Sequence, residues 1–589
     1  MIPEGKQAVL IDAVKAGKKY IVVEAPAGTG KTFSCIQATK AICDSGRLES
    51  FQKVLVLTFS RNARAQILKE LSLFPIDDAI YKHIDINNYH SFFKRYLDTY
   101  RDTIGIKSPL CVVDDDDYIS ELYNFANTSG ICLDTDLKCT VLDDFLLENG
   151  KLTVVNGKSR VKKGKYQNTK LFISTANSFT QKTGIICFAQ FGGLICKLLS
   201  RFPEMASAIS HDYPVLILDE YQDTNYYQER FVRMILSKSS GIFFCDRFQM
   251  IYDFRGSSVQ RIEDLPRLYP GIVKIEFDEY YRYKDKKDLV QLLVSIRNGQ
   301  APDYANLVNG CLLTVSVNCN QNWREIKNSK SQKAQCSLYA TAILYKTMRA
   351  ISGYLCCNKS VAILCRNNIE VDRLIELFFE KGYFPREISD TKDMTIIGKH
   401  LKALIQTNTI GDSISHILSI VLLCTSKKVL FGDRIESIST ISFASFKRKT
   451  KDAYKKIRPI VCASADKCDY RSKVDVVTQI MLVAENEGET INYGKRKFFL
   501  QCASLEKPSA ETIDGIMLQR QYTNSFSTLT PGLYITTVHQ SKGKEFDYVF
   551  TADIDLLSKD RNLLYVSHSR MKEKLFPIKV NYNGFKYGS

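Results

Sequence analysis

The chain lacks several signals that would define its class at once. Its 18 cysteines include no Cys-x-x-Cys pair, which argues against zinc ribbons and most iron–sulfur signatures. No uncharged apolar run approaches the roughly 18–20 residues that a membrane-spanning helix needs. Met1 is not followed by a charged-then-apolar leader, so we expect no secretory signal. These absences favour an intracellular protein with reduced thiols, in the cytoplasm or nucleoid, or in the nucleus of a eukaryote.

What the chain does have is length and positive charge. At 589 residues it exceeds one ordinary domain, and 45% apolar with 25% charged residues is ordinary for a globular protein. The 81 Lys and Arg against 64 Asp and Glu give a formal charge of +17. That charge suits a polyanionic partner such as nucleic acid, although moderately basic proteins without such a partner are also common.

A glycine-rich segment near the start predicts a phosphate-binding loop. The β-branched run Tyr20–Glu24 predicts a strand, and the sequence from Thr32 to about Gly46 predicts a helix, with the loop between them. Glycines let backbone N–H groups face phosphates, the loop lysine reaches the β- and γ-phosphates, and the hydroxyl ligates Mg²⁺. The predicted ATP-binding residues are Ala25, Pro26, Ala27, Gly28, Thr29, Gly30, Lys31 and Thr32.

A second segment supplies two carboxylates at the end of an apolar run. Val215–Leu218 predicts a buried strand that leads directly into Asp219 and Glu220. In such a site Asp219 would hold Mg²⁺, and Glu220 would act on the attacking water as the general base. An acidic turn after a strand is the alternative, and the phosphate loop upstream disfavours it. The two segments together predict hydrolysis of ATP with Mg²⁺ as the metal cofactor.

Further segments, taken in order along the chain, resemble the motifs of superfamily 1 helicases of the UvrD/Rep/PcrA type. Each segment alone is a weak signal, whereas the complete ordered set is specific. They are Val54–Ala63, Asn88–Phe92, Asp246–Gly256, Phe277–Arg282, Val361–Asn367, Thr536–Asp547 and Leu564–Arg570.

The resemblance implies roles for residues around the nucleotide. Gln7 would read the edge of the adenine, Tyr281 would stack on its ring, and Glu545 would accept a hydrogen bond from a ribose hydroxyl. For Tyr281 the alternative is an ordinary core or surface aromatic, because the chain has 31 tyrosines.

The resemblance also implies three groups that act on the γ-phosphate. Gln249 would sense it, and Arg282 and Arg570 would reach it from the second motor domain as arginine fingers. Cations at this position stabilise charge on the transferring phosphoryl group. A surface charge is the ordinary alternative for any single arginine.

For DNA, the resemblance implies base stacking on aromatic residues beside backbone-binding cations. Core packing is the alternative for the aromatic residues, because the chain has 32 phenylalanines. The implied stacking residues are Phe59, Tyr252 and Phe254, and the implied neighbours of the strand are His90, Arg255 and His539.

The chain departs from the family pattern at a few motif positions. Cys245 replaces the usual glycine before Asp246, Phe254 stands where many members have tryptophan, and Tyr280 replaces an asparagine. His568 and Ser569 precede Arg570 where threonine is common. None of these changes removes a charge or ligand that ATP hydrolysis needs.

The expected fold class is α/β. The resemblance implies two RecA-like parallel-sheet motor domains of the P-loop NTPase class, each carrying a mostly helical insertion. The expected ranges are 1–94 and 201–276 for motor domain 1, 95–200 for its 1B-like insertion, 277–387 and 529–589 for motor domain 2, and 388–528 for its 2B-like insertion.

Charged runs inside the two insertions leave alternatives open. The aspartates Asp114–Asp117 could bind a metal ion, but a solvated loop or helix start is the expectation. The basic runs could hold a nucleic-acid backbone or could be solvated loops; they are Lys158–Lys165, Lys447–Lys451 and Lys455–Arg458.

The leading hypothesis is an ATP-dependent DNA helicase that translocates on single-stranded DNA, by resemblance in the 3′-to-5′ direction, and unwinds duplexes. Its partners would be single-stranded DNA and single-strand/duplex junctions, with no membrane. One alternative is a DNA-sensing regulatory ATPase that controls a separate nuclease in repair or antiviral defence. Only 19 residues (589 minus 570) follow Arg570, so we expect no fused nuclease domain. An RNA-directed helicase is a weaker alternative.

Overall fold

The computed structural model describes residues 3–73, 81–134, 137–148, 151–155, 166–251, 258–318, 329–383, 385–387, 392–425, 438, 440–487, 493–525 and 530–583. Two compact units divide the chain. The first unit comprises Met1–Pro302 and Arg561–Ser569, and the second comprises Asp303–Asp560 and Arg570–Ser589. Within the described residues, no helix combines the length and apolar character needed to cross a bilayer.

A six-stranded parallel sheet forms the centre of the first unit. The strand order is β10-β1-β9-β8-β2-β3, and the pairs between these neighbours are all parallel. Parallel strands need crossover connections, which the intervening helices supply. The strands are β1 (Tyr20–Glu24), β2 (Val54–Thr58), β3 (Ile84–Asn88), β8 (Val215–Leu218), β9 (Ser240–Cys245) and β10 (Val273–Glu276).

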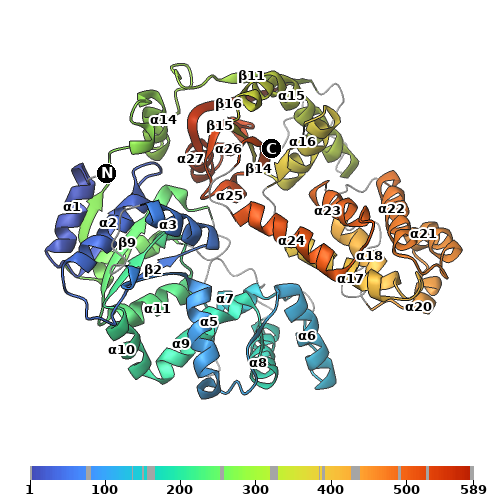
Figure 1. The fold of residues 1–589 in the computed structure, drawn as a ribbon, viewed down its shortest axis with the longest axis horizontal. Coiled ribbons are helices and arrows are strands. Elements are labelled where there is room, and N and C mark those ends of the chain that lie inside the picture. Colours follow the sequence, from blue (N-terminus) through green and yellow to red (C-terminus); the bar gives the residue numbers. More distant parts are fainter. Residues whose placement is uncertain are drawn as a thin grey trace. The chain divides into compact units, whose positions relative to one another are not determined.

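Helices cover both faces of this sheet (Figure 1). On β1, Val22 packs into one apolar cluster while Ile21 and Val23 pack into the other, as the two-residue period of a strand requires. One face is covered by α1 (Gly5–Lys15), α2 (Lys31–Asp44) and α3 (Arg61–Leu73). The opposite face is covered by α5 (Tyr89–Tyr100), α9 (Phe191–Arg201), α10 (Pro203–Asp212) and α11 (Tyr226–Leu236).

Side-chain caps fix where two of these helices begin. Asn88 at the end of β3 accepts a hydrogen bond from the backbone N–H of Ser91, 2.9 Å away, at the start of α5. Asn225 and Gln228 form a reciprocal capping box at the start of α11. Such caps satisfy backbone donors that a helix start leaves unpaired, so the turn between Asp219 and Asn225 ends at a defined position.

Shorter elements complete the first unit. The 3₁₀ turns are η1 (Arg101–Ile104), η3 (Phe188–Gln190), η4 (Tyr221–Asp223), η5 (Arg247–Gln249) and η7 (Tyr281–Tyr283). The helices are α12 (Val259–Glu263), α13 (Leu265–Leu268), α14 (Lys287–Arg297) and α27 (Arg561–His568). Although α27 is distant in sequence, it contacts η5 and α14.

A small separate core lies between α5 and α9 in the sequence. Tyr118 and Leu122 of one helix pack with Phe172 and Phe179 of another. Figure 1 shows these helices side by side, in the cyan part of the chain. The elements are β4 (Cys111–Val112), α6 (Asp115–Thr128), α7 (Thr140–Asp144), β5 (Phe145–Glu148), β6 (Lys151–Val154), α8 (Tyr166–Thr183) and β7 (Ile185–Ile186).

The second unit repeats the parallel-sheet plan. Its strand order is β11-β16-β15-β12-β14-β13, and its neighbouring strands also pair in parallel. The strands are β11 (Leu313–Asn318), β12 (Ser360–Cys365), β13 (Arg386–Glu387), β14 (Gly532–Thr537), β15 (Phe546–Thr551) and β16 (Met571–Asn583). The helices beside them are α15 (Ser329–Cys356), α16 (Asn368–Glu380), α25 (Val538–Ser541) and α26 (Ile554–Leu557).

Between β13 and β14 in the sequence, the described residues form a helical region with its own core. Leu418, Ile457 and Ile480 from three of its helices are fully buried in one cluster. The helices are α17 (Lys392–Gln406), α18 (Ile414–Cys424), α20 (Phe443–Arg448), α21 (Asp452–Ala463), α22 (Tyr470–Asn486), α23 (Tyr493–Ala503) and α24 (Ala510–Ser525).

The predicted fold class is confirmed: the protein is α/β, with two parallel sheets typical of RecA-like motor domains. The expected boundary at 276/277 differs from the observed division after Pro302. The first unit extends beyond residue 277 because it includes α14, which buries Leu289, Leu292, Leu293 and Ile296. The segment 561–569, expected in motor domain 2, also lies in the first unit.

Candidate nucleotide site

The phosphate loop connects β1 to α2 in a conformation that requires glycine at two positions. Gly28 and Gly30 have φ values of +86° and +79°, a region that residues with a Cβ rarely adopt. A Cβ at Gly28 would lie 2.8 Å from the ring of Tyr283. Thr29 closes the loop through hydrogen bonds from its N–H and its hydroxyl to the carbonyl of Pro26, at 3.2 and 2.8 Å.

The residues predicted to bind adenine flank the same loop. Gln7 of α1 is buried, and its Nε2 donates to the carbonyl of Thr29 at 3.0 Å. A Cβ placed on Gly30 would lie 2.5 Å from Nε2 of Gln7 and 3.5 Å from the ring of Tyr281. The hydroxyl of Tyr281 donates to Glu279 at 2.6 Å. Gln7 and Tyr281 therefore both lie beside Gly30 of the loop, and their roles toward adenine stay predictions.

Lys31 lies between the two predicted carboxylates. Its Nζ pairs with Glu220 and lies 3.7 Å from Oδ1 of Asp219. Glu220 also accepts a hydrogen bond from Nε2 of Gln222. The backbone of Glu220 is left-handed, with φ of 53°, which is strained for a residue with a Cβ. Strain of this kind concentrates at functional sites, and here it sets the direction of the candidate base.

Gln249, the predicted γ-phosphate sensor, is held by Asp246. Nε2 of Gln249 donates to Oδ2 of Asp246 at 3.0 Å, and both side chains are buried. The backbone N–H of Asp246 donates to Oε1 of Gln222 at 3.0 Å. Since Gln222 also contacts Glu220, the candidate sensor and the candidate base belong to one hydrogen-bonded network.

Two further residues of this network carried no predicted role. Tyr565 of α27 accepts a hydrogen bond from the N–H of Ala27 at 3.0 Å and donates to Oδ2 of Asp246 at 3.2 Å. Arg297 of α14 donates to Oδ1 of Asp246 at 2.9 Å. Tyr565 lies within the motif Leu564–Arg570, and this position in the sequence could have indicated a role at the site. Arg297 had none beyond being a cation at the end of an amphipathic helix.

Arg282 belongs to the first unit, although it was predicted to reach the site from the second motor domain. Its backbone N–H donates to the carbonyl of Gly28 at 3.0 Å, and its side-chain Nη1 donates to the carbonyl of Ser569 at 3.3 Å. The reason is that the chain continues from the edge strand β10 into η7 beside the loop before it leaves the unit.

The other predicted nucleotide residues lie in the second unit. Arg570 is buried, and its carbonyl accepts a hydrogen bond from the N–H of Phe546 at 2.9 Å. Glu545 is half-buried and immediately precedes β15. Their roles toward the nucleotide stay predictions.

The predicted DNA-binding residues are only partly described. Phe59 is half-buried in the turn that follows β2, and His539 is half-buried on α25. His90 on α5 makes edge contacts with Phe188 and Phe191, at centroid distances of 5.6 and 5.8 Å. Tyr252, Phe254 and Arg255 lie outside the described residues. The DNA roles of these six residues stay predictions.

The charged runs of the insertions also stay open. In the first, Asp115 begins α6, and a ligand atom on each of Asp115, Cys139 and Cys187 lies within 4.8 Å of the other two. Both thiols have acceptors, because Cys139 donates to the carbonyl of Asp115 and Cys187 to Oε1 of Gln190. Hydrogen bonding thus accounts for the buried cysteines without a metal ion.

Among the basic runs, Lys158–Lys165 lies outside the described residues. Lys447–Lys451 and Lys455–Arg458 are largely exposed on α20, α21 and the link between them. Lys456 pairs with Glu487 at 2.7 Å, and Lys447 lies over the ring of Phe443 at 4.3 Å. These contacts suit a solvated surface and leave the nucleic-acid alternative untested.

Burial changes the titration of groups beside the site. The imidazole of His568 is fully buried, and burial lowers its pKa to about 3. Burial raises the pKa of the Cys245 thiol to about 12, with Glu24 as the second cause. His568 is therefore neutral and Cys245 is a protonated thiol near pH 7, so neither adds charge to the site.

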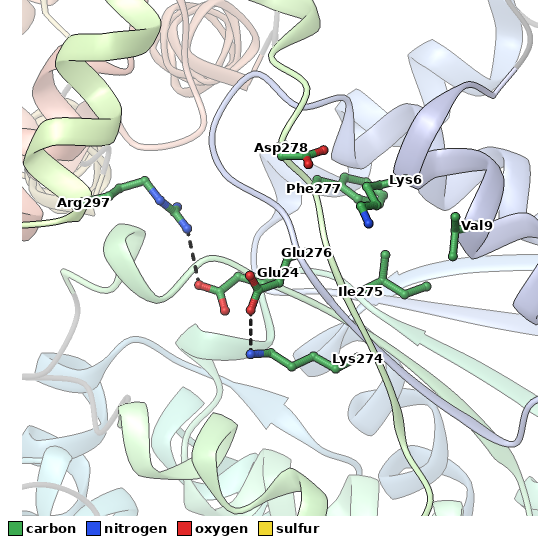
Figure 2. Close-up of a pocket in the computed structure, with 9 residues that line it drawn as sticks. All are labelled: Lys6, Val9, Glu24, Lys274, Ile275, Glu276, Phe277, Asp278 and Arg297. Atoms are coloured by element: carbon green, nitrogen blue, oxygen red, sulfur yellow. Dashed lines mark hydrogen bonds and ion pairs between the residues drawn. The ribbon is translucent and has the colours of Figure 1, made fainter.

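A cavity of about 510 Å³ opens beside the carboxyl ends of β1 and β10 (Figure 2). Arg297 points to Glu24 across one wall, 3.4 Å from Oε1, and Lys274 pairs with Glu276 at 2.6 Å on another. The cavity is lined by Lys6, Val9, Glu24, Lys274, Ile275, Glu276, Phe277, Asp278 and Arg297. Arg297, which pairs with Asp246, therefore lines a cavity that small solutes can enter.

The residues present fit a nucleoside triphosphate with a divalent cation. The glycines leave room where a Cβ would collide with neighbours, and Lys31 supplies a cation at the start of a helix, where anions bind well. Thr32 and Asp219 offer oxygen ligands of the kind Mg²⁺ prefers. Glu220 offers a carboxylate that could take a proton from water.

Comparison with known proteins matches the segments that contain these motifs to helicase domains. Residues 8–270 match the UvrD/REP helicase N-terminal domain, and residues 532–576 match the UvrD-like helicase C-terminal domain. A probable DNA helicase II homolog of Mycoplasma genitalium is 21% identical over 98% of this chain and 85% of its own length.

Other relatives match over shorter segments. A probable DNA helicase II homolog of Mycoplasma pneumoniae is 26% identical over 48% of this chain, and the match spans 41% of that relative. The ATP-dependent DNA helicase PcrA of Staphylococcus aureus is 24% identical over 46% of this chain and 37% of its own length. The matches therefore span less than half the length of these two relatives.

Proposed function

Because the chain belongs to the UvrD/Rep family of superfamily 1 helicases, we propose that it is an ATP-dependent DNA helicase. In this proposal it moves along single-stranded DNA in the 3′-to-5′ direction, acts at single-strand/duplex junctions, and works inside the cell. ATP hydrolysis drives the movement, with Mg²⁺ as the metal.

One observation carries the hydrolytic part of the proposal. Lys31 of the phosphate loop, the carboxylates Asp219 and Glu220, and the predicted sensor Gln249 meet within one unit. Three segments far apart in sequence supply these four groups, each following a strand of the parallel sheet at its carboxyl end, where ligands of open α/β sheets bind. This convergence supports ATP hydrolysis more strongly than any one motif does.

The proposed roles follow from the chemistry of each side chain. Lys31 binds the β- and γ-phosphates, and Thr32 and Asp219 would hold Mg²⁺, which neutralises phosphate charge when it is bound. Glu220 takes a proton from the attacking water, and Gln249 orients toward the γ-phosphate. Gln7 and Tyr281 hold the adenine.

The DNA part of the proposal rests on the family and on general physics. The formal charge of +17 favours a polyanion, and phosphate contacts make such binding weaken as salt rises. Phe59 is proposed to stack on a base, a contact that tolerates any sequence.

Two substitutions test the hydrolytic assignment. Lys31→Ala removes the phosphate-binding cation, and Glu220→Gln removes the base while keeping its shape. We expect each to lower the DNA-stimulated kcat for ATP by about 100-fold or more, which for Glu220→Gln is the usual effect of removing a general base. For Lys31→Ala the reason is the loss of the cation that neutralises charge on the phosphates. The measurement is steady-state phosphate release with saturating single-stranded DNA.

Glu204→Gln is the matched control, because Glu204 is an exposed carboxylate on α10 of the same unit. It should hydrolyse ATP at the rate of the unsubstituted protein. If Glu220→Gln keeps that rate as well, Glu220 is not the base.

A further inference from the structure

Tyr565 links two parts of the nucleotide site that are separated in sequence. Its side chain is fully buried, and its hydroxyl accepts from the N–H of Ala27 at 3.0 Å while it donates to Oδ2 of Asp246 at 3.2 Å. Ala27 lies in the phosphate loop, and Asp246 precedes the turn η5 that carries Gln249. One hydroxyl therefore bridges the loop and the sensor turn.

Asp246 receives a complete set of hydrogen bonds. Oδ1 accepts from the N–H of Phe248 at 3.1 Å and from Arg297 at 2.9 Å. Oδ2 accepts from Gln249 at 3.0 Å and from Tyr565 at 3.2 Å. A carboxylate has about four lone-pair sites, so these donors use all of them. Gln249 and Tyr565 donate to the same oxygen of Asp246. Replacing either residue therefore changes the hydrogen bonding of the oxygen to which the other donates.

Arg297 balances the charge of this fully buried carboxylate. Figure 2 shows the arginine pointing to Glu24, and its second nitrogen lies 3.4 Å from Oε1 of that residue. Its guanidinium stacks 4.6 Å above the ring of Phe248. Burial alone lowers the pKa of Arg297, but Asp246 and Tyr565 outweigh burial and raise it overall. The arginine therefore stays charged beside Asp246.

The tyrosine hydroxyl keeps its proton. Burial raises the pKa of Tyr565 well above its usual range, and the charge of Asp246 adds to this effect. A protonated hydroxyl can donate to Asp246 and at the same time accept from Ala27. Both hydrogen bonds are therefore compatible with a protonated hydroxyl.

We propose that Tyr565 is a positioning residue for ATP hydrolysis. It fixes the position of the phosphate loop relative to Gln249 through its hydrogen bond to Asp246. The inference rests on the proposed function, because it assigns a further residue to the same reaction. Tyr565 does not touch the nucleotide in this account. It acts through Ala27 on one side and through Gln249 on the other.

The test is Tyr565→Phe, which removes the hydroxyl and keeps the ring. Ala27 then has a buried N–H without its acceptor, and Gln249 loses the neighbour that shares its oxygen. We expect kcat to fall about tenfold, the rate equivalent of one buried hydrogen bond. The affinity for ADP should fall less than kcat does, because ADP lacks the phosphate that Gln249 is proposed to sense.

Tyr227→Phe is the matched control. Tyr227 is a buried tyrosine of the same unit whose hydroxyl donates to the carbonyl of Phe145 at 2.9 Å, remote from the loop in its bonding. Both variants lose one buried hydroxyl and should melt at similarly lowered temperatures. Only Tyr565→Phe should lose turnover.

A double variant separates positioning from simple structural support. If Tyr565 acts through Gln249, then in a Gln249→Ala background Tyr565→Phe should change kcat by less than about twofold, because coupled residues are not additive. A purely structural role would give the same fold-loss in both backgrounds.

Two results would overturn the inference while leaving the proposed function intact. One is an active protein in which Tyr565→Phe and Tyr227→Phe turn over ATP equally fast. The other is an equal loss from Tyr565→Phe with and without Gln249. Absence of ATP hydrolysis by the unsubstituted protein, with DNA present, would instead refute the proposed function.

Discussion

At the scale of single residues, the first unit contains a histidine whose burial couples stability to pH. His568 is fully buried next to Ser567, whose hydroxyl lies 3.0 Å from Nδ1. Burial lowers its folded-state pKa to about 3, below the usual 6.5 of a histidine. The unfolded chain therefore binds a proton here before the folded protein does.

The sign of the effect follows from proton linkage. The stabilising contribution of neutral His568 is complete above pH 6.5 and is lost as the pH falls toward 3, with a slope of about 1.4 kcal/mol per pH unit. Asp143 acts in the opposite sense, because burial raises its pKa to about 7. A comparison of variants is needed to isolate the histidine.

His568→Gln should remove the histidine part of this dependence. Between pH 6 and pH 4 we expect the unfolding free energy of the variant to fall less steeply than that of the unsubstituted protein, by about 1.4 kcal/mol per pH unit. Denaturant unfolding at several pH values measures the slopes. His211→Gln, which removes an exposed imidazole, is the control, and equal slopes for all three proteins would contradict the prediction.

At the scale of elements, the phosphate loop depends on what surrounds its glycines. Gly30 has a positive φ, and a Cβ there would collide with Nε2 of Gln7. Gly46 at the end of α2 also has a positive φ, of 66°, but a Cβ there would meet nothing within 4 Å. The two glycines thus share backbone strain and differ in surroundings.

Gly30→Ala should therefore weaken nucleotide binding, and Gly46→Ala should not. We expect Gly30→Ala to raise the Kd for ATP at least about tenfold, because the new methyl group displaces Gln7 and strains the loop by about 1–2 kcal/mol. Gly46→Ala should cost similar backbone strain and leave the Kd unchanged. Fluorescent-nucleotide titration measures both, and equal Kd values for the two variants would refute the account of the loop.

The phosphate loop could be predicted from the sequence because its chemistry is contiguous. Strand, glycines, lysine and hydroxyl follow one another within 20–32, and the acidic pair follows its own strand directly. The contact of Tyr565 with Ala27 could not be predicted in this way, since 538 residues separate them. Only the folded chain brings α27 to the loop.

At the scale of the whole molecule, the chain consists of two parallel-sheet units, each with an additional region that has a core of its own. The ordered motifs predicted this plan, because each strand-and-loop motif implies the same kind of parallel sheet. They did not predict where the first unit ends. That boundary depends on α14, whose Arg297 pairs with Glu24 and Asp246. Pairs between residues so far apart in sequence cannot be predicted from a local sequence pattern.

At this scale the proposed function depends on coupling between ATP hydrolysis and DNA, which requires more than the nucleotide site. The most direct test is the rate of ATP hydrolysis without nucleic acid, with single-stranded DNA and with single-stranded RNA, at low and moderate salt. We expect strong stimulation by DNA that weakens as salt rises, because DNA contacts release counterions. Hydrolysis that is unaffected by DNA, or stimulated by RNA alone, would contradict it.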